Sequence, residues 1–283
     1  MKKIGFIGMG NMAGAIACGI EKSGFLKAGD MIAFDIMDGQ LDKVKELGFS
    51  IADSEEDVVQ QSEMVFIGVK PQVVEKVLQP LKDLLKEKAI ISIVLGYDYA
   101  KYNEILDAST RHIFVMPNTP ALVLKGISLL EETHSLTKEE FAFTLDMFAS
   151  IGEVEIVPSH LMGVAGTVSG CGPAFIYMVI EALADGAVKE GMPRSMAYKL
   201  AAQTAVSYTH LLTSNTLGGS YIRFAKNGNA LDWRMPISFL APDLKAFPEN
   251  LPDTISNFDN LFKSSQFTNV DVYKRQVYGN LGF

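Results

Sequence analysis

The chain has 283 residues, of which 48% are hydrophobic, and carries a formal net charge of -8 at pH 7. That length suits two domains of ordinary size, and the apolar content is enough to form a buried core. The acidic balance and the lack of a Lys/Arg run disfavour nucleic acid and anionic membranes as partners. No unbroken apolar run reaches the roughly 18 residues of a membrane span, so we expect a cytoplasmic protein.

The first half of the sequence alternates short apolar segments with amphipathic ones. Strands are expected over 3–7, 31–34, 49–52, 64–69, 89–94, 112–115, 126–130 and 154–157. Helices are expected over 12–21, 40–47, from 55 onward, 71 to about 86, 100–106 and 137–150. Strands separated by helices of this length predict an α/β fold, with a doubly wound, mostly parallel sheet covered on both faces.

From residue 163 the pattern changes to long helices. A helix is expected to begin at Pro173 and to close at Gly191, and its residues 174–189 are apolar on nearly every side. A helix that is apolar all round is buried, either in a core or between subunits. With a second helix expected over 194–205, residues 163–205 read as the start of an all-helical domain that follows a domain over 1–162.

Beyond residue 205 the helical period is lost. Asparagine occurs three times in residues 1–205 but eight times in the last 78, together with four prolines. Residues 206–283 are therefore an irregular lobe, a disordered tail, or sequence that does not belong with the rest of the chain. We favour the last of these interpretations.

The segment Gly8-Met9-Gly10-Asn11-Met12-Ala13 has the G-x-G-x-x-A form of the dinucleotide-binding fingerprint, between an expected strand and an expected helix. Gly8 permits the tight turn, Gly10 lets the backbone approach a pyrophosphate, and the small Ala13 allows close packing of helix and strand. The phosphates would meet free N–H groups at the start of the helix. Residues 1–162 are thus predicted to form a Rossmann-like dinucleotide-binding domain.

Asp35 ends the second expected strand, where a carboxylate accepts hydrogen bonds from the adenosine ribose and repels a 2′-phosphate. The following Ile36 and Met37 supply no cation, which favours NADH over NADPH. A strand-end aspartate without a ligand is the alternative interpretation.

Three further segments lie where ligands bind in such sheets. Gly68-Val69-Lys70-Pro71 follows the fourth strand, and Met116-Pro117-Asn118-Thr119-Pro120 follows the sixth, with two prolines to hold Asn118 in one orientation. Ser169-Gly170-Cys171-Gly172-Pro173 is expected to open the apolar helix, with free N–H groups suited to a carboxylate or a nicotinamide amide. A solvated charge at Lys70 and a capping turn led by Ser169 are the structural alternatives.

Other kinds of catalytic site are not supported. Cys18 and Cys171 and the four histidines have no metal-ligand spacing, and neither G-x-S-x-G nor H-E-x-x-H occurs. The two cysteines also indicate a reducing compartment. We therefore expect no metal, assign no catalytic residue, and predict chemistry carried by a cofactor.

Taken in order, these motifs resemble the pyrroline-5-carboxylate reductase family. The resemblance covers residues 1 to about 205, and the segments 116–123 and 168–174 are its most specific parts. It implies hydride transfer from NADPH or NADH to 1-pyrroline-5-carboxylate, giving L-proline in the final step of proline biosynthesis, and a homo-oligomer. A protonated C=N bond already accepts hydride well, so orientation and a clamp on the carboxylate of the substrate would suffice.

The resemblance also assigns binding residues. Cofactor contacts are expected from Ile7, Gly8, Met9, Gly10, Asn11, Met12, Asp35, Gly68, Val69, Lys70, Pro71, Ile93, Val94 and Leu95. Contacts near the nicotinamide and substrate are expected from Asn118, Ser169, Gly170 and Gly172.

The sequence departs from the family in two places. The Ser-Pro-Gly-Gly-Thr-Thr loop that binds the carboxylate of the substrate is not found, and residues 213–220 resemble it only faintly. Residues 93–96 are bulkier than the family usually has. Two alternatives therefore stay open: a dinucleotide-binding protein without turnover, and a β-hydroxy-acid dehydrogenase. Enzymes of the second kind usually have a catalytic lysine on the first long helix of the helical domain. That alternative is disfavoured here because Lys189 lies at the far end of this helix.

Overall fold

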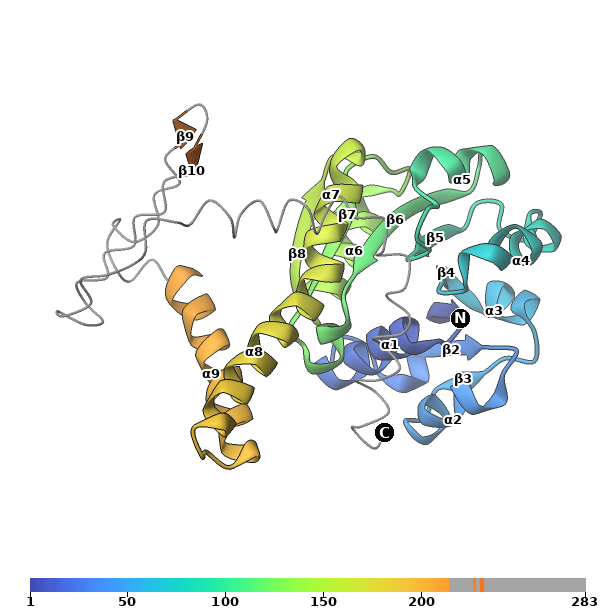
Figure 1. Cartoon of the computed structure of the whole chain (residues 1–283). Helices are drawn as coiled ribbons and strands as arrows, with labels where there is room; N and C mark the ends of the chain where they lie inside the picture. The colour runs from blue at the N-terminus through green and yellow to red at the C-terminus, as the bar shows by residue number, and fades with distance from the viewer. Residues whose placement is uncertain (214–225, 228–229, 232–283) are drawn as a thin grey trace. The chain divides into compact units, whose positions relative to one another are not determined.

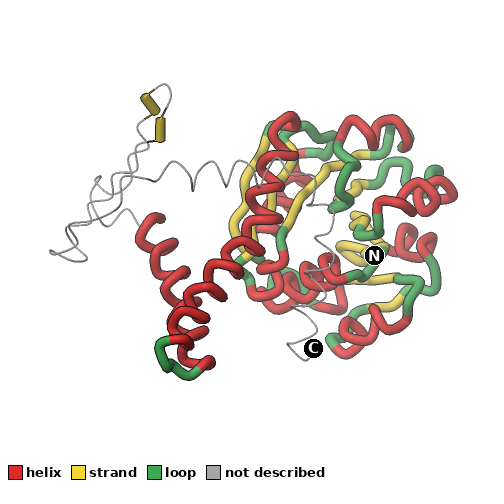
Figure 2. The backbone as a smooth tube through the Cα atoms, in the orientation of Figure 1, coloured by secondary structure: helices red, strands yellow, loops and turns green. Residues whose placement is uncertain are grey.

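The computed structural model of the protein describes residues 1–213, 226–227 and 230–231 (Figures 1 and 2). The chain divides into two compact units, Met1–Ser207 and Tyr208–Phe283. Most of segment 206–283, including nearly all of 213–220, therefore lies outside the described residues. Within it, the structure gives only the end of a helix and the strand pair β9 (Lys226–Asn227) and β10 (Ala230–Leu231).

The first unit is built on one eight-stranded sheet with the order β3-β2-β1-β4-β5-β6-β7-β8. The strands are β1 (Lys2–Ile7), β2 (Met31–Phe34), β3 (Ser50–Ile51), β4 (Ser62–Ile67), β5 (Ala89–Ser92), β6 (Arg111–Pro117), β7 (Gly126–Glu131) and β8 (Gly152–Val157). All neighbours are parallel except β6 and β7. Their connection is only the short 3-10 turn η3 (Thr119–Val123), which is too short for a parallel crossover. The predicted doubly wound, mostly parallel sheet is confirmed.

Helices cover both faces of this sheet, as Figure 1 shows. They are α1 (Asn11–Ser23), α2 (Asp38–Glu46), α3 (Glu55–Gln61), α4 (Val74–Leu81), α5 (Tyr99–Ile105) and α6 (Lys138–Ala149). Alternate strand residues form two cores because side chains on a strand point to opposite faces. Phe6 and Phe66 pack with α1, α2 and α6, whereas Val65 and Ile67 pack with α3, α4 and α5.

Helix α1 places the fingerprint at the edge of the sheet. Ile16 and Ile20 are fully buried on one side of it, and each stabilises the fold by about 1.5–3 kcal/mol relative to an exposed side chain. Gly24 ends the helix in the left-handed conformation, with φ of 78°. The start of α1 is therefore fixed relative to β1 by packing of its own apolar face.

After β8 the chain forms one helical run over Ser159–Lys189. It comprises the 3-10 turn η4 (Ser159–Leu161), α7 (Met162–Gly166), the π-helical turn η5 (Thr167–Cys171) and α8 (Gly172–Lys189). Pro173 lies in the first turn of α8 as expected, but the residues before it are already helical, and the N–H of Gly172 donates to the carbonyl of Val168. The expectation of free N–H groups at residues 169–173 was therefore wrong. The helix begins further upstream, so most N–H groups there have helical partners.

Helix α8 then turns back into α9 (Arg194–Thr213), which runs past the expected end at residue 205. The two helices pack through the small residues Ala184, Ala197 and Ala201. Of the residues of α8 only Ala184 is buried in the described part of the chain. Helix α8 is therefore not buried in the core that the described residues form.

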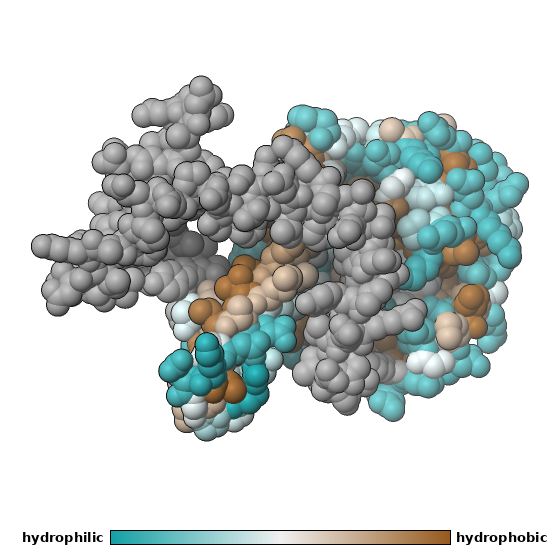
Figure 3. Space-filling model, viewed as in Figure 1, coloured by the Kyte–Doolittle hydropathy of each residue, from teal (hydrophilic) through white to brown (hydrophobic). Residues whose placement is uncertain are grey.

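The apolar residues of α8 are instead on the surface, where Figure 3 shows hydrophobic side chains along the helix. The exposed large ones are Ile176, Tyr177, Met178, Val179 and Leu183. Among the described residues, the run 159–189 is the one helix long and apolar enough to cross a membrane by length and composition. Such a helix needs a cover, and an apolar surface of this kind marks an interaction site.

Candidate active site

Open α/β sheets bind ligands in a crevice outside the carboxyl ends of the strands where the strand order reverses, and in this sheet that position, called the crevice below, is at β1 and β4. The chain leaves β1 for α1 on one face of the sheet and leaves β4 for α4 on the other face. The N–H of Gly8 donates to the carbonyl of Phe34 at 2.9 Å, and the N–H of Gly68 donates to that of Ile7 at 2.9 Å. Such a switch point is where open α/β sheets bind ligands.

Glycine is required on both sides of this crevice. Gly8 has φ of +88°, and a Cβ there would lie 2.9 Å from the carbonyl carbon of Gly68 and 2.9 Å from Cγ1 of Val69. A Cβ at Gly68 would lie 2.7 Å from Cβ of Ala13. The loops after β1 and β4 therefore approach as closely as they do only because these three positions are small.

The start of α1 faces open space. Gly10 is the N-cap, no described side chain caps the helix there, and a Cβ at Gly10 would meet no described atom within 4 Å. Asn11 is exposed and Met12 is half-buried, so the first turn has N–H groups without a side-chain acceptor. An anion such as a pyrophosphate fits this position, because the N–H groups and the helix dipole both favour negative charge.

Asp35, directly after β2, is tied to the glycine-rich loop. Its Oδ2 accepts a hydrogen bond from the N–H of Met9 at 2.7 Å, and its Oδ1 accepts one from the N–H of Met37 at 2.9 Å. The side chain of Met9 is itself buried in the core. The carboxylate is thus held at the edge of the crevice on the side of β2. Nothing in the sequence pattern indicated the contact with Met9.

Two further loops follow β4 and β5. Val69 is half-buried, Lys70 is exposed, and Pro71 opens the 3-10 turn η2 (Pro71–Val73). After β5, the N–H of Ile93 donates to the carbonyl of Ile67 at 3.1 Å, and Leu95 is exposed. The side chain of Val94 is a core residue, so only its backbone is available for the cofactor contact expected from it.

Asn118 and Ser169, far apart in the sequence, meet behind this edge of the sheet. The Nδ2 of Asn118 donates to the carbonyl of Ser169 at 3.1 Å, and its Oδ1 accepts from the N–H of Ile127 at 2.9 Å. In an α-helix the carbonyl of Ser169 would accept from residue 173, but Pro173 has no N–H. Asn118 supplies the donor that the proline lacks.

Two more features define this junction. The Oγ of Ser169 is buried and has no hydrogen-bond partner in the described part of the chain. Gly166 packs so tightly on β6 that a Cβ would overlap the sulfur of Met116. Gly170 is exposed, Gly172 is half-buried, and a Cβ at either would meet no described atom within 4 Å. Sequence reasoning missed the role of Gly166, because a single glycine within a helix carries no specific signal.

Two titratable groups with altered pKa values lie at the other edge of the sheet. Burial lowers the pKa of Lys88, which precedes β5. The hydrogen bonds that Arg111, at the start of β6, donates to the carboxylate of Glu140 raise the pKa of Arg111. These amino ends of the strands are opposite to the crevice, so both groups serve the fold. In the described residues, no three His, Cys, Asp or Glu side chains are grouped to hold a metal ion.

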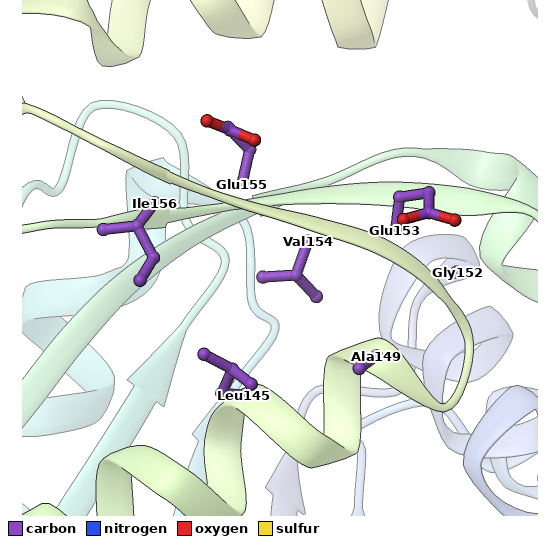
Figure 4. Close-up of a pocket in the computed structure, with 7 residues that line it drawn as sticks. All are labelled: Leu145, Ala149, Gly152, Glu153, Val154, Glu155 and Ile156. Carbon is purple, nitrogen blue, oxygen red and sulfur yellow. The ribbon is translucent and has the colours of Figure 1, made fainter. Parts of the chain in front are cut away.

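A hollow elsewhere on the surface is separate from the crevice. It is lined by Leu145 and Ala149 of α6 and by residues 152–156 of β8. Figure 4 shows Leu145 and Val154 pointing toward each other, with Glu155 directed away from them. With an apolar floor and no convergent polar groups, it has none of the features of a catalytic site.

The fold and the crevice define a class of protein: an oxidoreductase with a nicotinamide-dinucleotide domain. Comparison with protein families agrees. A model described as NADP oxidoreductase, coenzyme F420-dependent, matches residues 3–96. One described as pyrroline-5-carboxylate reductase dimerisation matches residues 159–221.

The chain belongs to the pyrroline-5-carboxylate reductase family. It is 39% identical over 207 residues to the pyrroline-5-carboxylate reductase of Methanosarcina acetivorans, which covers 72% of this chain and 77% of that protein. It is 38% identical over 210 residues to the Escherichia coli enzyme, with the same coverage. The resemblance inferred from the motifs is confirmed, and these relatives do not favour the two alternative functions.

Solved structures agree with this assignment. The Plasmodium falciparum pyrroline carboxylate reductase with NADP bound has a TM-score of 0.71 and 26% identity, and the match covers 93% of this chain and 91% of that one. The Streptococcus pyogenes enzyme has a TM-score of 0.67 and 26% identity, covering 96% and 94%. The predicted Rossmann-like domain followed by a helical domain is thus confirmed, and an NADP-type dinucleotide occupies the same fold in a relative.

Proposed function

We propose that this chain reduces 1-pyrroline-5-carboxylate to L-proline with NADH or NADPH, the last step of proline biosynthesis. The observation that carries the proposal is the glycine-lined crevice between β1 and β4, with the uncapped start of α1 beside it. When bound there, the reduced nicotinamide supplies the hydride. The residues of the chain bind and orient the reactants.

The cofactor would lie along the carboxyl edge of the sheet. Gly8, Gly10 and the first N–H groups of α1 would hold the pyrophosphate, and Asp35 would meet the adenosine ribose. Residues 68–71 and 93–95 would line the path toward β6. The exposed Lys70 and Leu95 are the side chains free to contact the cofactor in these two loops.

The substrate would bind near the junction of Asn118 and Ser169. Both ends of the Asn118 side chain are already bonded to protein, so it is a positioning residue that fixes this junction. The buried Oγ of Ser169 is the polar atom with bonding capacity left, and Gly170 and Gly172 leave room beside it. We assign no catalytic residue, because the family's Ser-Pro-Gly-Gly-Thr-Thr motif does not occur in this sequence.

The apolar face of α8 supports a homo-oligomer. Its large hydrophobic residues are exposed in the chain alone, and the matched dimerisation model covers this segment. A second copy of the chain would cover that face, which removes any need for a membrane to do so. We propose a cytoplasmic protein without nucleic-acid or membrane partners, and the cover of this apolar face by a second copy supports the proposal.

We also propose a domain division: a dinucleotide-binding domain over 1–162, the start of the helical domain over 163–205, and a segment over 206–283 that is not typical of the family. The matched dimerisation model runs from 159 to 221, across the second boundary.

Gly10→Ala tests the crevice without disturbing the fold. Because φ of Gly10 is −61° and a Cβ there meets no described atom within 4 Å, the variant should fold and melt like the parent. Its methyl group would occupy the space of the pyrophosphate, so we expect NADH and NADPH affinity to fall about tenfold or more. Gly29→Ala, in an equally open position outside the crevice, is the matched control.

Turnover is measured as NADH and NADPH oxidation by the purified full chain with pyrroline-5-carboxylate. Proline formation that is lost in Gly10→Ala and kept in Gly29→Ala supports the proposal. Cofactor binding without any proline at saturating substrate would refute the reductase activity and identify a non-catalytic dinucleotide-binding protein.

A further inference from the structure

We infer that Asp35 makes this chain select NADH and reject NADPH. The inference deepens the proposed function, on which it rests, by choosing between its two cofactors. It is not given by the relatives, since the matched family model and the Plasmodium structure both name NADP.

The carboxylate of Asp35 is fixed in place. Each of its oxygens accepts one backbone hydrogen bond, from Met9 at 2.7 Å and from Met37 at 2.9 Å. A carboxylate that swings away to admit a 2′-phosphate would break both bonds and free the N–H of the glycine-rich loop. Asp35 therefore resists displacement more than a strand-end aspartate with a free side chain.

The remaining bonding capacity of Asp35 suits a ribose diol. An ionised carboxylate has about four acceptor sites, and the two backbone bonds use two of them. The 2′- and 3′-hydroxyls of an NADH ribose are donors and match the sites that are left. A 2′-phosphate offers acceptor oxygens and negative charge, so it has nothing to donate and is repelled.

The residues that directly follow β2 supply no cation to offset this repulsion. Residues 35–42 include no Lys or Arg, and the two residues after Asp35 are the apolar Ile36 and Met37, which are 86% and 62% exposed. Asp38 begins α2 and adds a second negative charge. Lys70 follows β4, which is two strands from β2 in the sheet order and thus about 10 Å away by strand spacing.

Binding to the full chain tests the inference without relying on catalysis. Kd values are measured by titration calorimetry for NADH, NADPH, AMP and adenosine 2′,5′-bisphosphate. The last two contain only the adenosine half of each cofactor. We expect NADPH to bind at least about tenfold more weakly than NADH, and the bisphosphate more weakly than AMP by a similar factor.

Variants assign the discrimination to Asp35. In Asp35→Ser the ratio of the two Kd values should fall to within about threefold of one, and adding Ile36→Arg should reverse it. Asp38→Ser removes the same charge three residues along the chain and should leave the ratio within about twofold of the parent. If Asp35→Ser does not fold, Asp35→Asn replaces it, because this variant keeps the shape of the side chain and can accept one of the two backbone hydrogen bonds. The comparison of the four ligands on the parent chain does not depend on any variant.

The outcomes separate the inference from the proposed function. NADPH binding as tightly as NADH would overturn the inference and leave the reductase proposal standing. An equal change of the ratio in Asp38→Ser and Asp35→Ser would overturn the specific role of Asp35. No binding of any of the four ligands would refute the crevice itself, and with it both conclusions.

Discussion

Replacing Asn118 by leucine would separate the loop after β6 from the helical run. The side chain is only 8% exposed and joins the N–H of Ile127 to the carbonyl of Ser169. Leucine has a similar volume but leaves both groups without a partner. The carbonyl of Ser169 is buried, so loss of its hydrogen-bond donor costs about 1–3 kcal/mol. Loss of the acceptor for the half-buried N–H of Ile127 costs roughly a further 0.5–1.5 kcal/mol.

We therefore expect Asn118→Leu to lower the free energy of unfolding by about 2–4 kcal/mol, measured by urea denaturation. Exchange of the Ile127 amide hydrogen should accelerate, because its acceptor is gone. Since Asn118 is a positioning residue, kcat/KM for the imine substrate should fall more than the affinity for NADH. The matched control is Asn103→Leu, an exposed position on α5.

The reasoning is refuted if Asn118→Leu unfolds within about 0.5 kcal/mol of the parent with unchanged exchange at Ile127. In that case the hydrogen bond to Ser169 would be replaceable by water, and the junction would not depend on Asn118.

Two further predictions concern an ion pair and a helix face. Burial would raise the pKa of Glu140, but hydrogen bonds from Arg111 at 2.7 and 2.8 Å outweigh it, so the pKa is lowered below 4.5. Its stabilisation is present above pH 4.5 and is lost as the pH falls through the lower folded value. Glu140→Gln should destabilise the fold by about 1 kcal/mol at pH 7 and by less near pH 3 in urea titrations, unlike the exposed Glu139→Gln. Val179→Asp should reduce the mass of the particle in light scattering, whereas Glu181→Gln, an exposed change on α8, should leave it unchanged.

Much of the sheet could be predicted from the sequence because local signals and tertiary packing agree there. The run 31–34 is apolar and bounded by Asp30 and Asp35, and the structure has β2 at those same residues. Helix α1 likewise begins after Gly10, where the glycine pattern predicted a helix to follow a strand. These elements can be predicted without knowing their tertiary contacts, because the hydrophobic period of the local sequence indicates which residues are buried.

The junction between the domains could not be predicted in the same way. The segment from Ser169 to Pro173 has the composition of a helix start, yet it lies inside a longer helical run. What sustains that run is contact with β6, through Asn118 and through Met116 against Gly166. Such contacts join residues about 50 positions apart, and no local pattern records them. The bond between Asp35 and Met9 escaped sequence reasoning for the same reason.

The continuous helical run has a mechanical consequence. Its 31 residues span roughly 45 Å as a rod that starts on the sheet and ends in the α8–α9 hairpin. The helical run Ser159–Lys189 is continuous between the sheet and the α8–α9 hairpin. A force that a bound neighbour applies to the hairpin would therefore reach the carbonyl of Ser169, to which Asn118 is hydrogen-bonded. The π-helical turn Thr167–Cys171 is the one break in regular α-helical winding between α7 and α8, and it contains Ser169, the residue bonded to Asn118. If a second copy covers α8 as proposed, we expect assembly to influence the geometry of the proposed substrate end through this single helix.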